Sequence, residues 1–291
     1  MSPGIEALIH PHSAEELHEH LRDDEPFVVH DVHASVEELR SLPLLQSLET
    51  LLAAWPDPVE VFHPEVADEA SSVMVDCGEA QTQFASGMTL LFNEVQRHAP
   101  RLVPWLEAIR EDLGLSALTE ERCLVYATPA GTGTATHFDQ NANFVLQLRG
   151  TKRWLLAPNH NVSQPMTRHR LGQPLDPELE SYSRLPMPSA MPDDHVEIVL
   201  EPGSVLFVPR GSWHATHAST DALSLNFTFS APTWLDLFTA ALRGRLAQSE
   251  QWRESAAPLE AATFEALLRE LAEDAAHWTA SDILAVTEGQ Q

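Results

Sequence analysis

A histidine and an aspartate lie two residues apart, at His137 and Asp139, directly after the small-residue run GTGTAT. Residues i and i+2 of a β-strand face the same side, so both side chains could reach one metal ion. Two histidines and one carboxylate bind Fe(II) on one face and leave three coordination positions open. The pair therefore predicts two of the three protein ligands of a non-haem iron site.

The third ligand has to come from a distant segment. In PGSVLFVPRGSWHATHA an apolar strand ends at a turn that contains Pro209 and Gly211, and His214 follows this turn. His217, three residues further along, is the competing candidate. We expect His214 to complete the site, because a sandwich or a small barrel can bring two such distant strands together.

The spacing of a histidine and an acid is a weak signal by itself. With 15 histidines and 43 acidic residues among 291 positions, roughly two such pairs arise by chance. Two further pairs occur, His63 with Glu65 and His195 with Glu197. Neither follows a run of small residues, which would let a substrate or cofactor approach the backbone closely. We therefore favour the pair that follows GTGTAT.

The chain contains a single lysine, Lys152. The strands NFVLQLR and KRWLLA flank Gly150-Thr151, a dipeptide typical of a two-residue hairpin turn. In such a hairpin, Lys152 shares a face with His137 and Asp139 unless a bulge intervenes. A buried cation needs an anion, and the distal carboxylate of 2-oxoglutarate, whose 2-oxo acid end chelates iron, would supply one. The alternative is an exposed lysine beside a turn.

These residues require a framework of short strands. Helices are expected over 13–21, 35–42 and 44–55, strands over 26–32, 59–63 and 71–77, and two helices over 88–115. From residue 121 to about 230, short apolar strands separated by turn residues predict a sandwich or a small barrel. The polar, Pro-rich stretch 159–194 interrupts them and is predicted to be a loop that covers the substrate.

The end of the chain is predicted to be helical. Phe264, Leu267, Leu268 and Leu271 follow the spacing of one apolar helix face. A helical subdomain is therefore expected over 231–291. It could pack on the sandwich or pair with a second copy in a homodimer, and both possibilities stay open.

Charge and cysteine content limit the partners and the compartment. Acidic residues outnumber basic ones by 43 to 17, which gives a formal charge of −26. Such a surface repels phosphate, so nucleic acid is an unfavourable partner. Two cysteines without a CxxC pair predict no disulfide and favour the reducing cytoplasm. We expect no signal peptide and no membrane span, because no suitable apolar run occurs.

Three segments together resemble a known family. THFDQNANFVLQLRGTKRWLLAP, EPGSVLFVPRGSWHATHA and LSLNFTF are similar to the JmjC-type cupin-fold 2-oxoglutarate oxygenases, which include asparaginyl hydroxylases and bacterial ribosomal oxygenases. The resemblance implies a mainly β protein with helical additions. Its core would be a double-stranded β-helix, the cupin or jelly-roll fold, over 121–230. Mixed helices and strands of 1–120 would pack on this core, and the helical subdomain 231–291 would follow it.

The resemblance also assigns residues. It implies that Fe(II) is held by His137, Asp139 and His214, and it places Lys152 where the family carries its 2-oxoglutarate-binding cation. It further implies that three polar residues hold the cofactor or order the metal site, namely Thr134, Asn143 and Asn226.

The activity that follows is Fe(II)- and 2-oxoglutarate-dependent hydroxylation of a C–H bond, on a protein or peptide side chain. A small-molecule hydroxylase and an N-methyl-lysine demethylase would use the same site. Two other classes are a non-catalytic metal-binding cupin module and a cupin dioxygenase that needs no 2-oxoglutarate. The complete ligand set argues against the module, and Lys152 argues against the dioxygenase.

Overall fold

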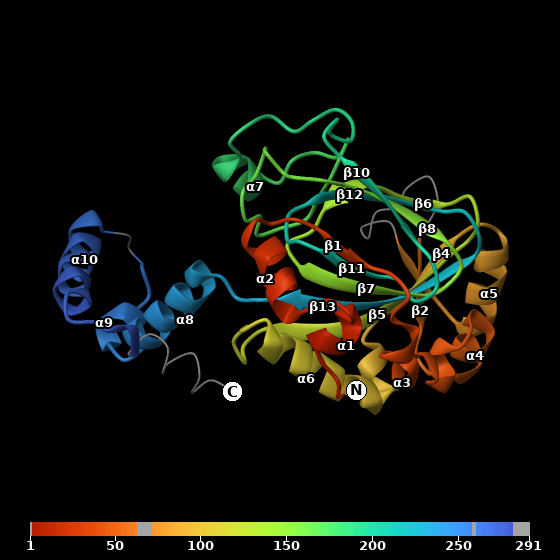
Figure 1. Cartoon of the computed structure of the whole chain (residues 1–291). Coiled ribbons are helices and arrows are strands. Elements are labelled where there is room, and N and C mark those ends of the chain that lie inside the picture. Colours follow the sequence, from red (N-terminus) through yellow and green to blue (C-terminus); the bar gives the residue numbers. More distant parts are fainter. Residues whose placement is uncertain (1, 63–71, 258–259, 282–291) are drawn as a thin grey trace. The chain divides into compact units, whose positions relative to one another are not determined.

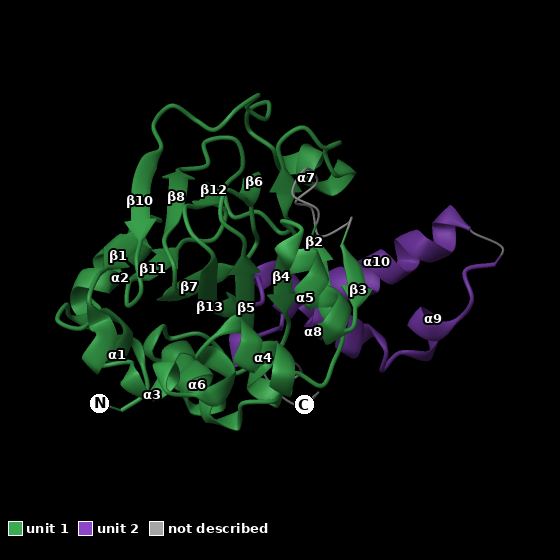
Figure 2. Cartoon of the chain, turned by 90° about the vertical axis from the view of Figure 1, so that its right-hand side faces the viewer, with its two compact units in different colours: residues 1–230 green, residues 231–291 purple. Residues whose placement is uncertain are grey.

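The computed structural model describes residues 2–62, 72–257 and 260–281, and Figure 1 shows their helices and strands. The chain divides into two compact units, residues 1–230 and residues 231–291 (Figure 2). Residues from the first 120 positions and from 121–230 share one hydrophobic core. The first unit is therefore a single structural body that contains the whole β-structure.

Two antiparallel sheets make up the first unit. The larger sheet has the order β1 (Phe27–Val29), β11 (Val205–Val208), β7 (Ala142–Arg149), β13 (Ala222–Ser230), β5 (Glu120–Thr128), β4 (Thr89–Phe92), β2 (Val59–Phe62) and β3 (Val73–Val75). The smaller sheet has the order β10 (Val196–Leu200), β8 (Lys152–Ala157), β12 (Trp213–Ala218), β6 (Gly133–Phe138) and β9 (His169–Arg170). From β5 to β8 the chain alternates between the two sheets, as in a jelly roll, which confirms the predicted cupin-type core.

Most helices of the first unit lie on the outer face of the larger sheet, whereas α7 (Pro177–Tyr182) packs with the smaller sheet (Figure 1). The first unit contains α1 (Ile5–Ile9), α2 (Ala14–Arg22), α3 (Glu37–Arg40), α4 (Leu48–Ala54), α5 (Cys77–Ala85), α6 (Val103–Asp112) and α7 (Pro177–Tyr182). Leu8, Leu51 and Trp105 of these helices pack in one buried cluster with Phe144 and Phe227 of the sheet. Alternate residues of β7 and β13 therefore face the helices, and the residues between them face the other sheet.

The predicted hairpin at Gly150-Thr151 is wrong. Strand β7 pairs with β11 and β13, whereas β8 pairs with β10 and β12, so the turn carries the chain from one sheet to the other. Gly150 has φ +68°, and a Cβ atom there would lie 2.0 Å from the backbone oxygen of Asp221. This close approach lets the chain cross between sheets. Lys152 nevertheless points into the space between the two sheets, where it lines a pocket.

Other expected elements differ in their detail. The first of the two helices predicted over 88–115 is replaced by strand β4, followed by two short 3₁₀ turns, Val95–Arg97 and Pro100–Leu102, before α6. The expected strand end at Cys77 is instead the beginning of α5. The helix predicted over 13–21 is confirmed as α2, with Ser13 as its N-cap in a reciprocal capping box with Glu16.

The second unit is helical, with α8 (Trp234–Leu246), α9 (Glu250–Arg253) and α10 (Ala261–Ala275). Arg245 of α8 holds Asp274 of α10 through two contacts of 2.9 and 2.7 Å. Among the described helices of the whole chain, none is long and apolar enough to cross a membrane.

Candidate active site

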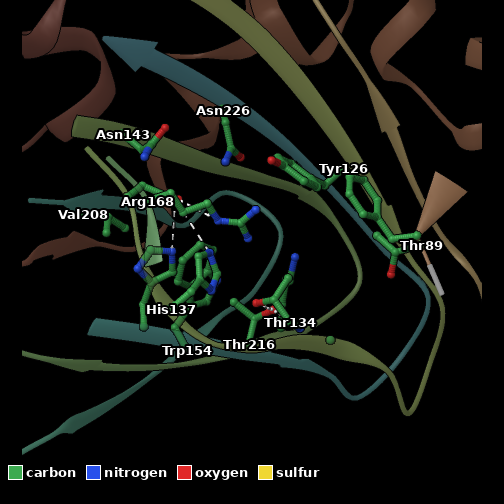
Figure 3. A pocket seen from close by; sticks show the side chains of 15 residues that line it. Thr89, Tyr126, Thr134, His137, Asn143, Trp154, Arg168, Val208, Thr216 and Asn226 are labelled. Atoms are coloured by element: carbon green, nitrogen blue, oxygen red, sulfur yellow. Dashed lines mark hydrogen bonds and ion pairs between the residues drawn. The ribbon is translucent and has the colours of Figure 1, made fainter. Parts of the chain in front are cut away.

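A pocket lies between the two sheets of the first unit (Figure 3). The smaller sheet lines it with His137 and Thr134 of β6, Lys152 and Trp154 of β8, and His214 and Thr216 of β12. The larger sheet lines it with Phe62 of β2, Thr89 of β4, Tyr126 of β5, Asn143 of β7, Val208 of β11 and Asn226 of β13. The two sheets thus bring together side chains that are distant in the sequence.

His137, Asp139 and His214 converge in this pocket. His137 and His214 are direct cross-strand partners on β6 and β12, and their ring centroids are 4.1 Å apart. Asp139 Oδ2 lies 3.6 Å from His137 Nε2 and 3.5 Å from His214 Nε2. One ligand atom from each residue lies within 4.8 Å of the other two, and this is the one metal-ligand cluster found among the described residues. The two imidazoles and the carboxylate therefore face a common point.

Both histidines present the same ring nitrogen to that point. The Nδ1 atom of His137 lies 2.7 Å from the carbonyl oxygen of Ala135, and that of His214 lies 2.9 Å from the carbonyl oxygen of Ser212. Each Nδ1 donates to a backbone carbonyl two residues earlier. Because this fixes the neutral tautomer, the Nε2 lone pair is free to bind a metal.

The protonation states also suit metal binding. Burial lowers the pKa of His137 to about 3, so the ring is neutral near pH 7. Burial alone would raise the pKa of Asp139, but His137, His214 and the Arg168 guanidinium outweigh it and lower that pKa well below its ordinary value. Neutral imidazole and ionised carboxylate are the forms in which these side chains bind metals. The donor set fits a divalent iron with open coordination positions.

Lys152 is buried in the same pocket, with 4% of its surface exposed. Its Nζ donates a hydrogen bond to Thr128 Oγ1 at 3.2 Å and lies 5.7 Å from the ring centroids of Tyr126 and Trp154. Within the described part of the chain, no carboxylate pairs with it, and burial lowers its pKa to about 8. A buried cation without a carboxylate suits an anionic ligand, as the carboxylate of 2-oxoglutarate would be.

The three further polar residues named from the sequence also line the pocket. Thr134 Oγ1 lies 2.9 Å from Thr216 Oγ1, and Asn143 Oδ1 accepts a hydrogen bond of 2.6 Å from Thr228. Asn226 is 8% exposed, and its buried Oδ1 has no hydrogen-bond partner among the described residues. A buried amide oxygen of this kind can accept a hydrogen bond from a ligand or a bound water.

Arg168 enters the pocket from the 159–194 stretch and was not singled out from the sequence. Its Nε lies 3.2 Å from Asp139 Oδ1, and its guanidinium points into the cavity (Figure 3). Sequence reasoning also missed Tyr126, Trp154 and Thr216. Nothing in the local sequence TRHRL separates Arg168 from Arg170, so only the folded chain identifies it.

The competing histidines that the structure describes do not form a comparable site. His63 and Glu65 lie outside the described residues. His195 and Glu197 are exposed, and Glu197 pairs instead with Arg153 at 3.4 Å. His217, the competitor of His214, is also exposed. Among the described residues, the structure therefore gathers the preferred ligands and neither the His195 and Glu197 pair nor His217.

Comparison with known proteins gives consistent relatives. The JmjC domain profile matches residues 107–237 of this chain. The chain is 35% identical to the uncharacterized protein YxbC of Bacillus subtilis over 262 residues, which cover 87% of this chain and 78% of YxbC. It is 29% identical to ribosomal oxygenase 1 of Gallus gallus over 187 residues, which cover 59% of this chain and only 27% of that protein.

Solved structures of Escherichia coli YcfD share the fold. One superposes with a TM-score of 0.55 at 18% identity, covering 88% of this chain and 66% of YcfD. Another, of YcfD described as a ribosomal oxygenase in complex with cobalt and 2-oxoglutarate, gives a TM-score of 0.50 at 17% identity, covering 89% of this chain and 65% of that one. This chain therefore spans about two thirds of YcfD and about a quarter of ribosomal oxygenase 1.

Proposed function

This chain belongs to the JmjC-type family of cupin-fold Fe(II)- and 2-oxoglutarate-dependent oxygenases, and we propose that it hydroxylates a C–H bond on a protein or peptide side chain. The proposal depends above all on one observation. A pocket with three convergent metal-ligand atoms also contains a buried ammonium without a carboxylate partner among the described residues.

The residues would divide the work as follows. His137, Asp139 and His214 would hold iron through Nε2, Oδ2 and Nε2. Lys152 would bind the distal carboxylate of 2-oxoglutarate, with Thr128 beside its ammonium. When bound, the iron and its co-substrate supply the oxidation of a C–H bond by O₂. The protein keeps coordination positions open and orients the reactants in a pocket sheltered between two sheets.

Arg168 lies on the wall of the pocket, where the carboxylate of Asp139 at 3.2 Å compensates its charge. The net charge of −26 is compatible with a basic protein as the substrate.

A pair of histidine substitutions tests the proposed function. Purified protein with Fe(II), 2-oxoglutarate and O₂ should form succinate, with turnover stimulated by substrate peptides. His214→Ala should reduce succinate formation by at least about 100-fold, because a ligand is lost. His217→Ala, which removes an exposed histidine from the same strand, should leave it unchanged. Equal turnover in both variants, or none in the unaltered protein, would contradict the proposal.

A further inference from the structure

The two carboxylate oxygens of Asp139 have different surroundings. Oδ2 faces both histidine Nε2 atoms, at 3.6 and 3.5 Å. Oδ1 lies 3.2 Å from Arg168 Nε, in an ion pair without hydrogen-bond geometry. A carboxylate that could turn freely would be able to offer both oxygens to one metal ion. Here one oxygen is already engaged by a cation of the protein.

The position of Arg168 is fixed by the elements around it. Strand β9 begins at the next residue and pairs with β6, the strand of His137. Two residues after β9 begins, the Leu171 backbone N–H donates to the carbonyl oxygen of Thr136 at 3.0 Å. On the other side, the Arg210 guanidinium donates to the carbonyl oxygen of Pro165 at 3.1 and 2.7 Å. The backbone around Arg168 is therefore anchored on one side to strand β6 and on the other side to the turn between β11 and β12.

Apolar packing supports the same segment. Val162, Leu179 and partly buried Leu171 form a cluster with Phe138 and Trp213, which are adjacent to the ligands His137 and His214 in sequence. The stretch that the sequence describes as a polar loop thus has a small core of its own. This small core also includes residues of β6 and β12, the strands that carry His137 and His214.

We propose that Arg168 is a positioning residue that restricts Asp139 to binding iron through Oδ2 alone. The inference rests on the proposed function, since it concerns the same metal site. A second Asp139 oxygen on the metal would occupy one of the three positions left by the His, Asp and His ligands. Those positions are needed for the two chelating oxygens of 2-oxoglutarate and for O₂. By holding Oδ1, Arg168 keeps them open and orients the ligand before metal arrives.

Metal binding by full-length variants tests this role without requiring a substrate. Co(II) is titrated anaerobically into the metal-free protein, and 2-oxoglutarate is then titrated at saturating Co(II). Arg168→Met keeps the length of the side chain but removes the charge and the planar fork, and it should weaken Co(II) binding by about 10- to 100-fold. It should also weaken 2-oxoglutarate binding and change the visible Co(II) spectrum, because Asp139 can then bind through both oxygens. Arg168→Lys keeps the charge without the fork and should restore part of the affinity.

A matched control removes an arginine from another ion pair of the same sheet. Arg153, beside Lys152, pairs with Glu197 at 3.4 Å on the surface, and Arg153→Met should bind Co(II) and 2-oxoglutarate as the unaltered protein does. The thermal midpoint of each metal-free variant shows whether the fold is intact. If Arg168→Met does not fold, the test depends on Arg168→Lys. In that case, Co(II) and 2-oxoglutarate affinities equal to those of the unaltered protein would overturn the inference.

The outcomes separate the inference from the proposed function. Failure of the unaltered protein to bind Co(II) in a manner that depends on His214 would overturn the proposed metal site. A different result would overturn only the role of Arg168 and would leave the proposed function standing. In that case the unaltered protein binds Co(II) through His214, and both Arg168 variants bind it with the affinity and spectrum of the unaltered protein. If Arg168→Met binds Co(II) more weakly than Arg168→Lys, and both bind it more weakly than the unaltered protein, the result supports both the proposed function and the role of Arg168.

Discussion

The buried ammonium of Lys152 affects stability as well as binding. Burial lowers its pKa from an ordinary 10.5 to about 8, which corresponds to roughly 3 kcal/mol of unfavourable burial of the charged form. Between these two pH values the folded, ligand-free chain has released the proton while the unfolded chain still holds it. Stability rises with pH wherever the unfolded state binds more protons. This contribution of Lys152 therefore increases from pH 8 to pH 10.5.

Lys152→Met should show this effect in denaturant unfolding of the metal-free protein. Near pH 7 the variant should be more stable than the unaltered chain by up to about 3 kcal/mol, because no charge is buried. The difference should shrink as the pH rises above about 8. The same variant should bind 2-oxoglutarate at least about 10-fold more weakly near pH 7, since a charge-assisted contact is lost. A stability difference independent of pH, with unaltered 2-oxoglutarate binding, would contradict the placement of this lysine.

The residues of the site differ in how far sequence reasoning could find them. His137, Asp139 and His214 were predicted from strand periodicity and a turn, and the structure brings their ligand atoms together. Lys152 was singled out by its uniqueness in the chain. Arg168 carries no such signal, because its contact with Asp139 depends on how β9 docks beside β6. Residues placed by tertiary pairing of a short strand are outside the reach of local patterns.

At the scale of elements, the sequence shows strands more clearly than it shows their partners. The apolar alternation around Phe144 and Leu146 correctly indicated a strand with two different faces. The same pattern could not reveal that the next strand belongs to the other sheet, because Gly-Thr between two strands fits either a hairpin or a crossing. The stretch TLLF at Thr89–Phe92 was taken for helix, since a short apolar run has no period that separates the two structures.

The crossing between sheets can be tested at Gly150. Gly150 and Gly172 both have positive φ, +68° and +82°, but only Gly150 lies against another backbone, where a Cβ would be 2.0 Å from the Asp221 oxygen. Gly172→Ala should reduce the free energy of unfolding by about 1–2 kcal/mol through backbone strain alone. Gly150→Ala should lose about 2–5 kcal/mol, because overpacking adds to the same strain. Urea unfolding of both variants measures the difference, and equal losses would show that the close approach is unimportant.

At the scale of the whole molecule, the buried apolar residues are distributed very unevenly. Among the described residues, the four buried hydrophobic clusters lie within residues 1–230. Among the described residues of 231–291, Ala241 alone is a buried apolar residue, whereas Trp234, Leu235 and Phe238 of α8 are 82, 52 and 47% exposed. The described helices of this segment bury too little apolar surface to offset the conformational entropy of their own folding. We therefore propose that these helices are stabilised by pairing with a second copy of the chain, which is one of the two possibilities that the sequence leaves open.

Truncation at the boundary between the units tests this division. A chain of residues 1–230 should unfold cooperatively and bind Co(II) with the affinity of the full-length protein, because it contains every cluster and every ligand of the site. Light scattering should show a dimer for the full-length chain and a monomer for 1–230. The isolated segment 231–291 should lose helix content on dilution, because its folding depends on association. Phe238→Ser together with Leu235→Ser should weaken the full-length dimer without changing Co(II) affinity. The pairing would be overturned if the full-length chain is monomeric and the isolated segment 231–291 keeps its helix content at all concentrations. In that case the Co(II) titration of 1–230 would still show whether the metal site needs residues 231–291.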